Sequence, residues 1–210
     1  MFRDRTDAGE QLADRLAGED LTDAVVLALP RGGVPVALPI AARLGAPLDL
    51  ILVRKIGVPG NAELAAGALV EGAEEPVFNS GLLRELGLSE ADFTGAIAAL
   101  RWEIANRRQT YLNGRAPVPL MGRSVIVVDD GIATGATIRA ALHGIAGRGA
   151  GEIVLAVPVA PQGVLAELQP LCDRIICLET PARFVAVGVH YADFGQVSDD
   201  EVRALLDQTL

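Results

Sequence analysis

The chain is poor in cysteine, histidine and aromatic residues. Its 210 residues include only two cysteines and two histidines, and aromatic residues make up 4% of the chain. Cys172 and Cys177 fall within one apolar, strand-like run, so we expect neither a disulfide framework nor a zinc site. This cysteine usage fits a reducing, cytoplasmic setting best.

Long apolar runs and clustered positive charge are also lacking. No stretch offers the roughly 18 uninterrupted apolar positions of a membrane span, and the first five residues are largely charged, so we expect no membrane segment and no signal peptide. The 18 basic residues face 27 acidic ones, for a formal net charge of −9. A large nucleic-acid footprint is therefore disfavoured, whereas a small anion held by a few local cations remains compatible.

What the chain does contain is an alternation of buried-strand and helical patterns. Apolar, β-branched runs predict strands at 24–29, 48–53, 125–128, 152–159 and 174–178. Helical spacing of apolar residues predicts helices at 7–17, 36–44, 162–169 and 198–206, and an alanine-rich pattern after 137 predicts another. Alternating strands and helices form parallel sheets with right-handed crossovers. We therefore expect one α/β domain over 1–210 with about five parallel strands, and a ligand beyond their carboxyl ends.

The middle of the chain interrupts this alternation. Residues 65–70 could form another strand, 81–88 a short helix and 89–111 a long helix that starts at Ser89 with an acidic first turn. We expect a helical insertion at about 80–115, packed on the core. A buried stripe is predicted for the long helix from the spacing of Phe93, Ile97, Leu100 and Ile104, with Trp102 adding bulk.

The strand at 125–128 ends in two carboxylates, Asp129 and Asp130, followed by a loop of small residues and a helix start. Residues 134–137 can present backbone N–H groups and two hydroxyls to an anion at that helix N-terminus. The alternative is a tight strand-to-helix turn with a threonine cap. Two adjacent carboxylates repel one another unless donors or a cation satisfy them, and a mere turn has no need of both. The pair therefore favours a binding site.

The run Val-Ile-Val-Val-Asp-Asp-Gly-Ile-Ala-Thr-Gly-Ala-Thr at 125–137 resembles the phosphoribosyl pyrophosphate (PRPP) motif of the type I phosphoribosyltransferases. The resemblance implies a Rossmann-like fold in which Asp129 and Asp130 meet the ribose hydroxyls, directly or through water on Mg²⁺. It also implies that the following loop wraps the 5-phosphate. The PRPP-binding residues expected in that loop are Gly131, Ala133, Thr134, Gly135, Ala136 and Thr137.

A second stretch, Leu29-Pro30-Arg31-Gly32-Gly33, resembles the pyrophosphate loop of the same family. In that loop a non-proline cis peptide turns backbone N–H groups toward the pyrophosphate, so the resemblance implies a cis bond before Arg31. Gly32 and Gly33 would bind PRPP. The alternative is a glycine-rich turn with a solvated arginine.

A third stretch, Arg54-Lys55 at the end of the strand expected at 48–53, resembles the basic pair of adenine-type phosphoribosyltransferases. Cations placed there would stabilise the charge that develops on the leaving pyrophosphate. The alternative is an ordinary surface basic pair. Residues 56–63 would then be a loop-like lid that excludes water, with Asn61 and Glu63 as side chains that could point inward.

The tail at about 181–210 would be the family's hood. Its segment 184–188 loosely resembles the one that stacks a nucleobase, so Phe184, Val185 and Tyr191 are candidates for contact with the acceptor. Aromatic residues also commonly anchor a core, and that alternative stays open. Further candidates are Asp193 as a partner for Mg²⁺ or a turn cap, and His190 as a polar contact, whereas His143 is expected on the surface.

One position departs from part of the family. Ala133 stands where 6-oxopurine enzymes carry an acid/base aspartate, which argues against hypoxanthine or guanine transfer by that mechanism; adenine and uracil enzymes also have alanine there. We expect a homodimeric, Mg²⁺-dependent enzyme that transfers phosphoribosyl from PRPP to a nitrogen acceptor and releases pyrophosphate. Arg31, Arg54 and Lys55 would act on the pyrophosphate. The alternatives are a PRPP-binding regulator without turnover and a hydrolase acting on a phosphorylated sugar.

Overall fold

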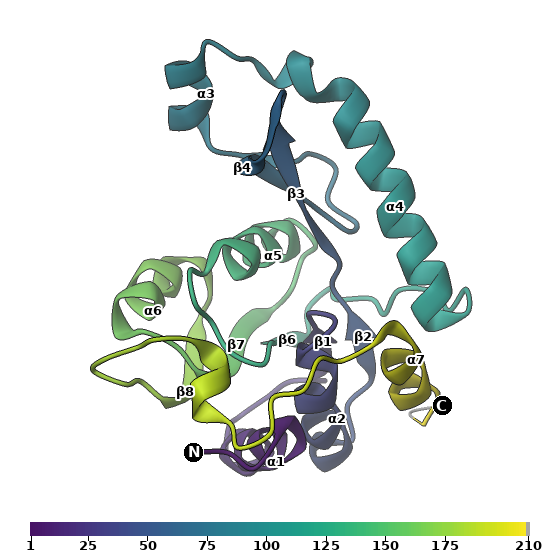
Figure 1. The fold of residues 1–210 in the computed structure, drawn as a ribbon. Coiled ribbons are helices and arrows are strands. Elements are labelled where there is room, and N and C mark those ends of the chain that lie inside the picture. The colour runs from purple at the N-terminus through teal and green to yellow at the C-terminus, as the bar shows by residue number, and fades with distance from the viewer. Residues whose placement is uncertain (209–210) are drawn as a thin grey trace.

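A parallel sheet of five strands forms the centre of the computed structural model, which describes residues 1–208 except for the side chains of residues 62 and 63 (Figure 1). The strand order is β2-β1-β6-β7-β8, and every neighbouring pair is parallel. This confirms the α/β class and the expected sheet. The strands are β1 (Val25–Ala28), β2 (Leu48–Leu50), β6 (Ser124–Val128), β7 (Glu152–Val159) and β8 (Arg174–Glu179).

Helices cover both faces of this sheet. Alternate strand residues such as Val26 and Ile126 pack with α1 (Arg5–Leu16) and α2 (Gly33–Leu44). The residues between them pack on the other face, with α5 (Ala136–Ala146) and α6 (Gln162–Leu168). Because both sides of each central strand are buried, these strands are continuous apolar runs in the sequence.

The strand order places a binding crevice. From β1 the chain passes to β2 on one side, whereas β6 is followed by β7 and β8 on the other, so the order reverses between β1 and β6. In open α/β sheets ligands bind outside the carboxyl ends of the strands at such a reversal. The loops that begin at Pro30 and Asp129 both start at this edge.

A second, antiparallel sheet follows β2 and corrects two predictions. It consists of β3 (Val53–Val58), β4 (Asn61–Val70) and β5 (Val77–Phe78). Arg54-Lys55 therefore lies inside a strand and does not end one, and 56–63 is a hairpin where a loop was expected. The glycines and proline that suggested a loop form the irregular register around Gly57 and the turn at Gly60, whose φ is 79°.

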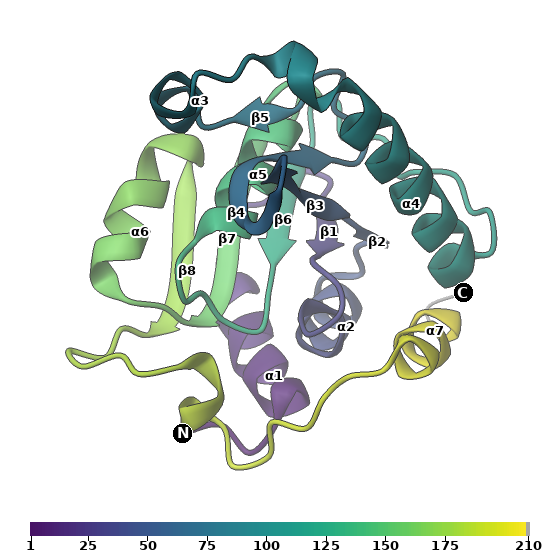
Figure 2. The ribbon, with the colours of Figure 1, turned by 45° about the horizontal axis from the view of Figure 1, so that its top comes forward.

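The helical insertion contains α3 (Ser80–Leu86), a 3-10 turn (Glu90–Phe93) and α4 (Thr94–Leu112), which runs along the outside of the molecule (Figures 1 and 2). Phe93 and Ile104 are buried as expected. Trp102 is 69% exposed, so the prediction that it adds bulk to the buried stripe was wrong. The whole insertion between β2 and β6 is larger than predicted because it begins with the antiparallel sheet.

A buried ion network fastens this insertion to the central sheet. Asp49 of β2 is 2% exposed, and Arg108 of α4 donates from Nη2 to both of its carboxylate oxygens at 3.0 and 3.1 Å. Arg108 also donates from Nη1 to Glu71 Oε1 at 2.9 Å, directly after β4. Burial raises the pKa of Glu71, while Arg108 opposes that rise. One arginine thus joins three parts of the chain.

The chain after β8 passes over the edge of the sheet formed by the carboxyl ends of the strands. An irregular segment with a 3-10 turn (Val187–His190) leads to α7 (Asp199–Asp207), which packs against α2 and α4 (Figure 2). Ser198 caps α7 in a reciprocal capping box with Glu201. Across residues 1–208, no helix combines the length and apolar character needed to cross a membrane.

Candidate functional site

The loop between β6 and α5 forms a small cradle. It borders a hollow of about 160 Å³, and Gly135, with a φ of 74°, caps α5 in the left-handed region that glycine favours. The first N–H groups of a helix have no partner within it and point toward any anion at that end. The exposed loop residues beside these groups are Ala133, Thr134, Ala136 and Thr137. Such an arrangement of backbone N–H groups and hydroxyls is one that can bind an anion.

The acidic pair lies at the start of this loop, partly buried. Asp129 Oδ1 accepts the backbone N–H of Asp130 at 2.8 Å. Burial and the neighbouring Asp130 carboxylate raise the pKa of Asp129 well above its usual value, and burial also raises the pKa of Asp130. A cation or hydroxyl donors brought by a ligand would relieve this strained pair of charges.

Arg5 of α1 is a site residue that the sequence analysis missed. Its Nε donates to Asp130 Oδ2 at 2.7 Å and its Nη1 donates to the Gly195 carbonyl. The guanidinium lies 3.8 Å from the centre of the Phe194 ring. Arg5 is 125 positions from Asp130 in the sequence, so no local pattern could reveal the pair. It lowers the pKa of Asp130 against the effect of burial.

The glycine-rich loop after β1 is pressed against the acidic pair. The Pro30–Arg31 peptide bond is cis, as the resemblance implied. A Cβ on Gly32 would lie 2.0 Å from Asp130 Oδ2, and one on Gly33 would lie 2.7 Å from the Val128 carbonyl oxygen. A Cβ on Gly33 would therefore clash with backbone, whereas one on Gly32 would displace the Asp130 carboxylate. The two loops that the sequence placed at one sheet edge are in direct contact.

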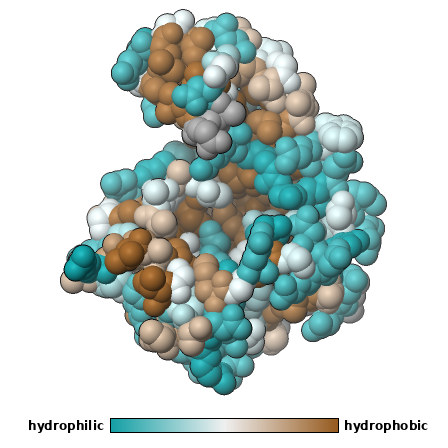
Figure 3. Space-filling view, in the orientation of Figure 1, coloured by the Kyte–Doolittle hydropathy of each residue, from teal (hydrophilic) through white to brown (hydrophobic). Residues whose placement is uncertain are grey.

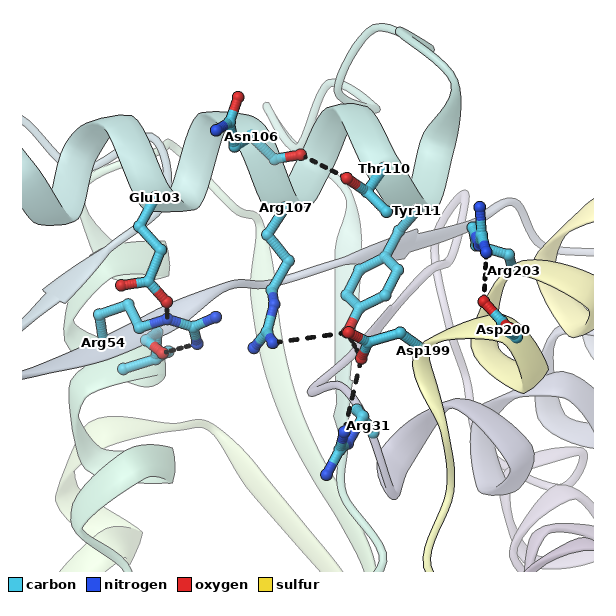
Figure 4. Close-up of polar contacts among 11 residues, drawn as sticks. Arg31, Arg54, Glu103, Asn106, Arg107, Thr110, Tyr111, Asp199, Asp200 and Arg203 are labelled. Carbon is cyan, nitrogen blue, oxygen red and sulfur yellow. Dashed lines mark hydrogen bonds and ion pairs between the residues drawn. The ribbon is translucent and has the colours of Figure 1, made fainter.

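Arg31 projects from this loop toward α4 and α7 (Figure 4). Its Nη1 lies 3.6 Å from Asp199 Oδ1, the same oxygen that accepts the Tyr111 hydroxyl at 2.6 Å. Arg107 Nη2 lies 3.8 Å from the other Asp199 oxygen. Asp199, Arg107 and Tyr111 were not recognised as site residues in the sequence. The acidic first turn of the C-terminal helix was visible there, but it does not indicate what that turn faces.

Arg54 and Lys55 lie against different parts of the structure. Adjacent strand residues point to opposite faces, so β3 directs the two side chains apart. Arg54 Nε donates to Glu103 Oε1 of α4 at 2.6 Å (Figure 4), whereas Lys55 lines a pocket of about 340 Å³ together with Thr137 of the loop between β6 and α5. In the space-filling view the molecule is hollowed between the antiparallel sheet and the central domain (Figure 3). Asn61 is exposed, and the Glu63 side chain lies outside the described part of the structure.

The hood residues divide into anchors and exposed groups. Tyr191 is buried and its hydroxyl donates to the Asp130 carbonyl at 2.6 Å, so it fixes the hood to the acidic loop. Phe184 stacks on His190 with ring centres 5.9 Å apart, and Val185 is exposed. Asp193 is exposed and accepts the Gly195 N–H at 3.1 Å, the geometry of a turn cap. Outside the hood, His143 is exposed as expected.

The donor set at the acidic pair suits Mg²⁺ bound together with a substrate. Among the described side chains, no group of three or more acidic, histidine or cysteine residues could hold a metal ion. Mg²⁺ commonly takes one or two carboxylates and completes its shell with water and substrate phosphates. Asp129 and Asp130 would supply those carboxylates. The fit is to a cation that arrives with its phosphate ligand.

Comparisons with known proteins agree with this geometry. The family model described as "Phosphoribosyl transferase domain" matches residues 4–193. The protein named "Putative phosphoribosyl transferase" from Mycobacterium tuberculosis (strain H37Rv) is 47% identical over 208 residues, which are 99% of this chain and 47% of that protein. The chain thus spans about half the length of that curated relative.

Two further likenesses differ in extent. The crystal structure of TT1426 from Thermus thermophilus is 43% identical, with a TM-score of 0.84 over 99% of this chain and 98% of that one. A uracil phosphoribosyltransferase from Streptomyces griseus is 39% identical over 85 residues, which are 40% of this chain and 38% of that protein. The first likeness covers the whole fold, including the insertion, and the second only part of the chain.

Proposed function

Because the chain belongs to the phosphoribosyl transferase family, we propose that it binds PRPP with Mg²⁺ and transfers the phosphoribosyl group to a nitrogen acceptor, releasing pyrophosphate. The observation that carries this proposal is the contact between the two loops. Gly32 lies against the Asp130 carboxylate, so the loop proposed to bind pyrophosphate and the carboxylates proposed to bind ribose border the same space. A ligand with a sugar between two phosphate groups would match that arrangement.

The role of each part follows from its chemistry. The N-terminus of α5 and Thr134 to Thr137 would bind the 5-phosphate, and Asp129 with Asp130 would bind the ribose hydroxyls and Mg²⁺. Bound Mg²⁺ would neutralise charge on the diphosphate. Arg31 and the N–H groups of the loop at Gly32 and Gly33 would hold the diphosphate, with its leaving oxygen in reach of positive charge.

In the reaction, the bond from the anomeric carbon to the diphosphate oxygen breaks and the diphosphate takes the electron pair. A bond from the same carbon to the acceptor nitrogen forms, and the acceptor loses a proton. Catalysis would rest on positioning and on charge stabilisation, for which no covalent enzyme nucleophile is needed. Of the two basic residues on β3, Lys55 faces the loop proposed to bind the 5-phosphate. Arg54 is bound to Glu103 and would affect the reaction only by positioning α4.

The acceptor would contact the hood. On the hood, Phe184 is partly buried and Val185 is exposed, and either could contact a heterocycle. Tyr191 is already used as an anchor, so the proposal does not depend on it. Ala133 favours acceptors of the adenine or uracil type, and the local likeness to a uracil enzyme makes uracil the first to test. A homodimer in the cytoplasm is part of the same proposal.

Pyrophosphate release tests this function. The protein is mixed with PRPP, Mg²⁺ and single nucleobases, starting with uracil and adenine, and released pyrophosphate is measured. Release with one acceptor supports the transferase, and tight PRPP binding without release for any acceptor would favour a regulator. An Asp130→Ala variant that stays folded is expected to lose PRPP binding. Absence of PRPP binding in the wild type would contradict the proposal.

A further inference from the structure

Asp199 pairs with Arg31 and also with Arg107 and Tyr111 of the inserted helix α4, and the reaction described above does not use these three side chains. The Asp199 carboxylate lies between Arg31 and Arg107, and the Tyr111 hydroxyl holds one of its oxygens (Figure 4). These groups come from the loop after β1, from α4 and from α7. A carboxylate flanked by two guanidinium groups occupies a position that suits an anion.

The hold of the two arginines on this carboxylate is loose. The nitrogen–oxygen distances of 3.6 and 3.8 Å exceed those of hydrogen bonds, whereas Tyr111 donates at 2.6 Å. The side chains of Arg31, Arg107 and Asp199 are 37%, 34% and 43% exposed. A hollow of about 380 Å³ lies against Arg31 and Asp199. Arg31 therefore faces this hollow, and both guanidinium groups are partly exposed to solvent.

The charges of this cluster do not balance. Two cations face one carboxylate, since the neighbouring Asp200 pairs with Arg203 instead. A guanidinium binds phosphate oxygens through two parallel N–H donors, and a diphosphate offers oxygens to two such groups at once. Arg31 already belongs to the loop proposed to hold pyrophosphate. Arg107 approaches the same point from the opposite side.

We propose that Arg107 is a further pyrophosphate-binding residue, and that Asp199 occupies the anion position shared by Arg31 and Arg107 until a diphosphate displaces it. The inference rests on the proposed function, because it names the partners of the same diphosphate. It gives the helical insertion a role in binding, since α4 carries Arg107 into the site. It also makes α7 sensitive to whether the diphosphate is present.

Asp199 acts here as a competitor because it carries charge of the same sign as the ligand. The hydrogen bond from Tyr111, together with Arg107 and Arg31, lowers the pKa of Asp199, so it is ionised at neutral pH. A unit charge about 4 Å from a ligand charge in water changes affinity by roughly fivefold. Removing the Asp199 charge should therefore strengthen diphosphate binding, whereas removing the Arg107 charge should weaken it.

Calorimetric titration of inorganic pyrophosphate into the full chain tests this inference. Asp199→Asn keeps an oxygen for Tyr111 and should bind pyrophosphate about fivefold more tightly than the wild type. Arg107→Gln should bind it about tenfold more weakly, as expected for the loss of a charge-assisted hydrogen bond. Asp207→Asn and Arg101→Gln are the matched controls on the same two helices, away from the hollow, and should stay within about twofold of the wild type.

The combination of variants gives a stricter result. In an Arg107→Gln background, Asp199→Asn should gain less affinity than it does alone, because one of the two contested cations is gone. Unchanged or weaker binding by Asp199→Asn, unchanged binding by Arg107→Gln, or no pyrophosphate binding by either the wild type or Asp199→Asn would overturn the inference.

Failure of this inference is distinguishable from failure of the proposed function. If PRPP binds and Asp130→Ala abolishes that binding, the proposed site stands. Wild-type behaviour of Asp199→Asn and Arg107→Gln would then overturn only the role of Arg107 and Asp199. If PRPP binds to none of these proteins, the proposed function itself fails.

Discussion

Replacing Arg108 with alanine should destabilise the protein far more than removal of a surface arginine. Among the described residues, Asp49 forms an ion pair only with Arg108. Without Arg108, the charged Asp49 carboxylate would be unpaired at a position that is 2% exposed. Breaking a buried ion pair by removing one partner costs about 3–5 kcal/mol. Asp49 keeps two backbone donors, the N–H groups of Leu50 and Val118 at 2.8 Å, so we expect the lower end of that range, about 3 kcal/mol.

Urea unfolding followed by circular dichroism at pH 7 measures this loss. Arg43→Ala is the matched control, because Arg43 forms an ion pair with Asp14 in which both side chains are more than half exposed. Such surface pairs contribute about 0–1 kcal/mol. A loss for Arg108→Ala no larger than that of the control would refute the view that this network fastens α4 to the sheet.

The pH dependence of the same variant provides a second check. Burial raises the pKa of Glu71 even with Arg108 opposing it, and removal of Arg108 should raise that pKa further. A carboxyl whose folded-state pKa is raised binds more protons in the folded than in the unfolded state, so its cost is absent below the unfolded-state pKa, grows between that pKa and the raised one, and is constant above the raised pKa. The destabilisation should therefore be smaller at pH 5 than at pH 7, and a loss independent of pH would contradict this cause.

Three further predictions concern single side chains. Gly32→Ala should leave thermal stability nearly unchanged but weaken PRPP binding at least tenfold by calorimetry. The new methyl carbon would lie 2.0 Å from Asp130 Oδ2 and would therefore displace the flexible Asp130 carboxylate. Unchanged affinity in the folded variant would contradict this prediction. Burial raises the pKa of Cys172 and Cys177 from 9.0 to about 11. Their thiolate fractions near neutral pH are therefore about a hundredfold below that of an ordinary cysteine. Iodoacetamide should label the native protein slowly compared with the urea-unfolded chain. Trp102→Ala should change the free energy of unfolding by less than about 0.5 kcal/mol, because Trp102 is largely exposed, and a loss above about 2 kcal/mol would restore the buried role inferred from sequence.

The central sheet could be predicted because its determinants are local. Each central strand is buried on both faces and therefore forms a short continuous apolar run, as at 125–128. The acidic pair and the glycine-rich loop follow directly after such strands. Once the strands were assigned, the geometry of parallel sheets placed both loops at one edge.

The antiparallel sheet could not be predicted for a local reason. The run at 48–53 covers the whole of β2, the link of Ile51 and Leu52, and the first residue of β3, and its single polar residue, Asp49, lies within β2. Ile51 and Leu52 are both buried, so the largely apolar sequence from 48 to 53 looks like that of one continuous strand. Gly57, Pro59 and Gly60 are typical of loops, although here they belong to an irregular hairpin.

The remaining features depend on tertiary pairing. Arg5 reaches Asp130, and Asp199 reaches Tyr111, across separations that leave no spacing to detect. In the sequence, Arg5 was only one of the charged residues at the N-terminus, and Asp199 was only part of a helix start. The packing of α1, α4 and α7 around the sheet determines which of their charged residues lie at the site.

Equilibrium binding of PRPP tests the central claim, that the acidic pair and the loop after β1 form one PRPP site. PRPP with Mg²⁺ is titrated by calorimetry into the wild type, Asp130→Asn and, as a control, the surface variant Asp14→Asn. The account predicts saturable one-site binding to the wild type and the control, with at least tenfold weaker binding to Asp130→Asn. No binding to the wild type, or equal affinity for Asp130→Asn, would contradict it.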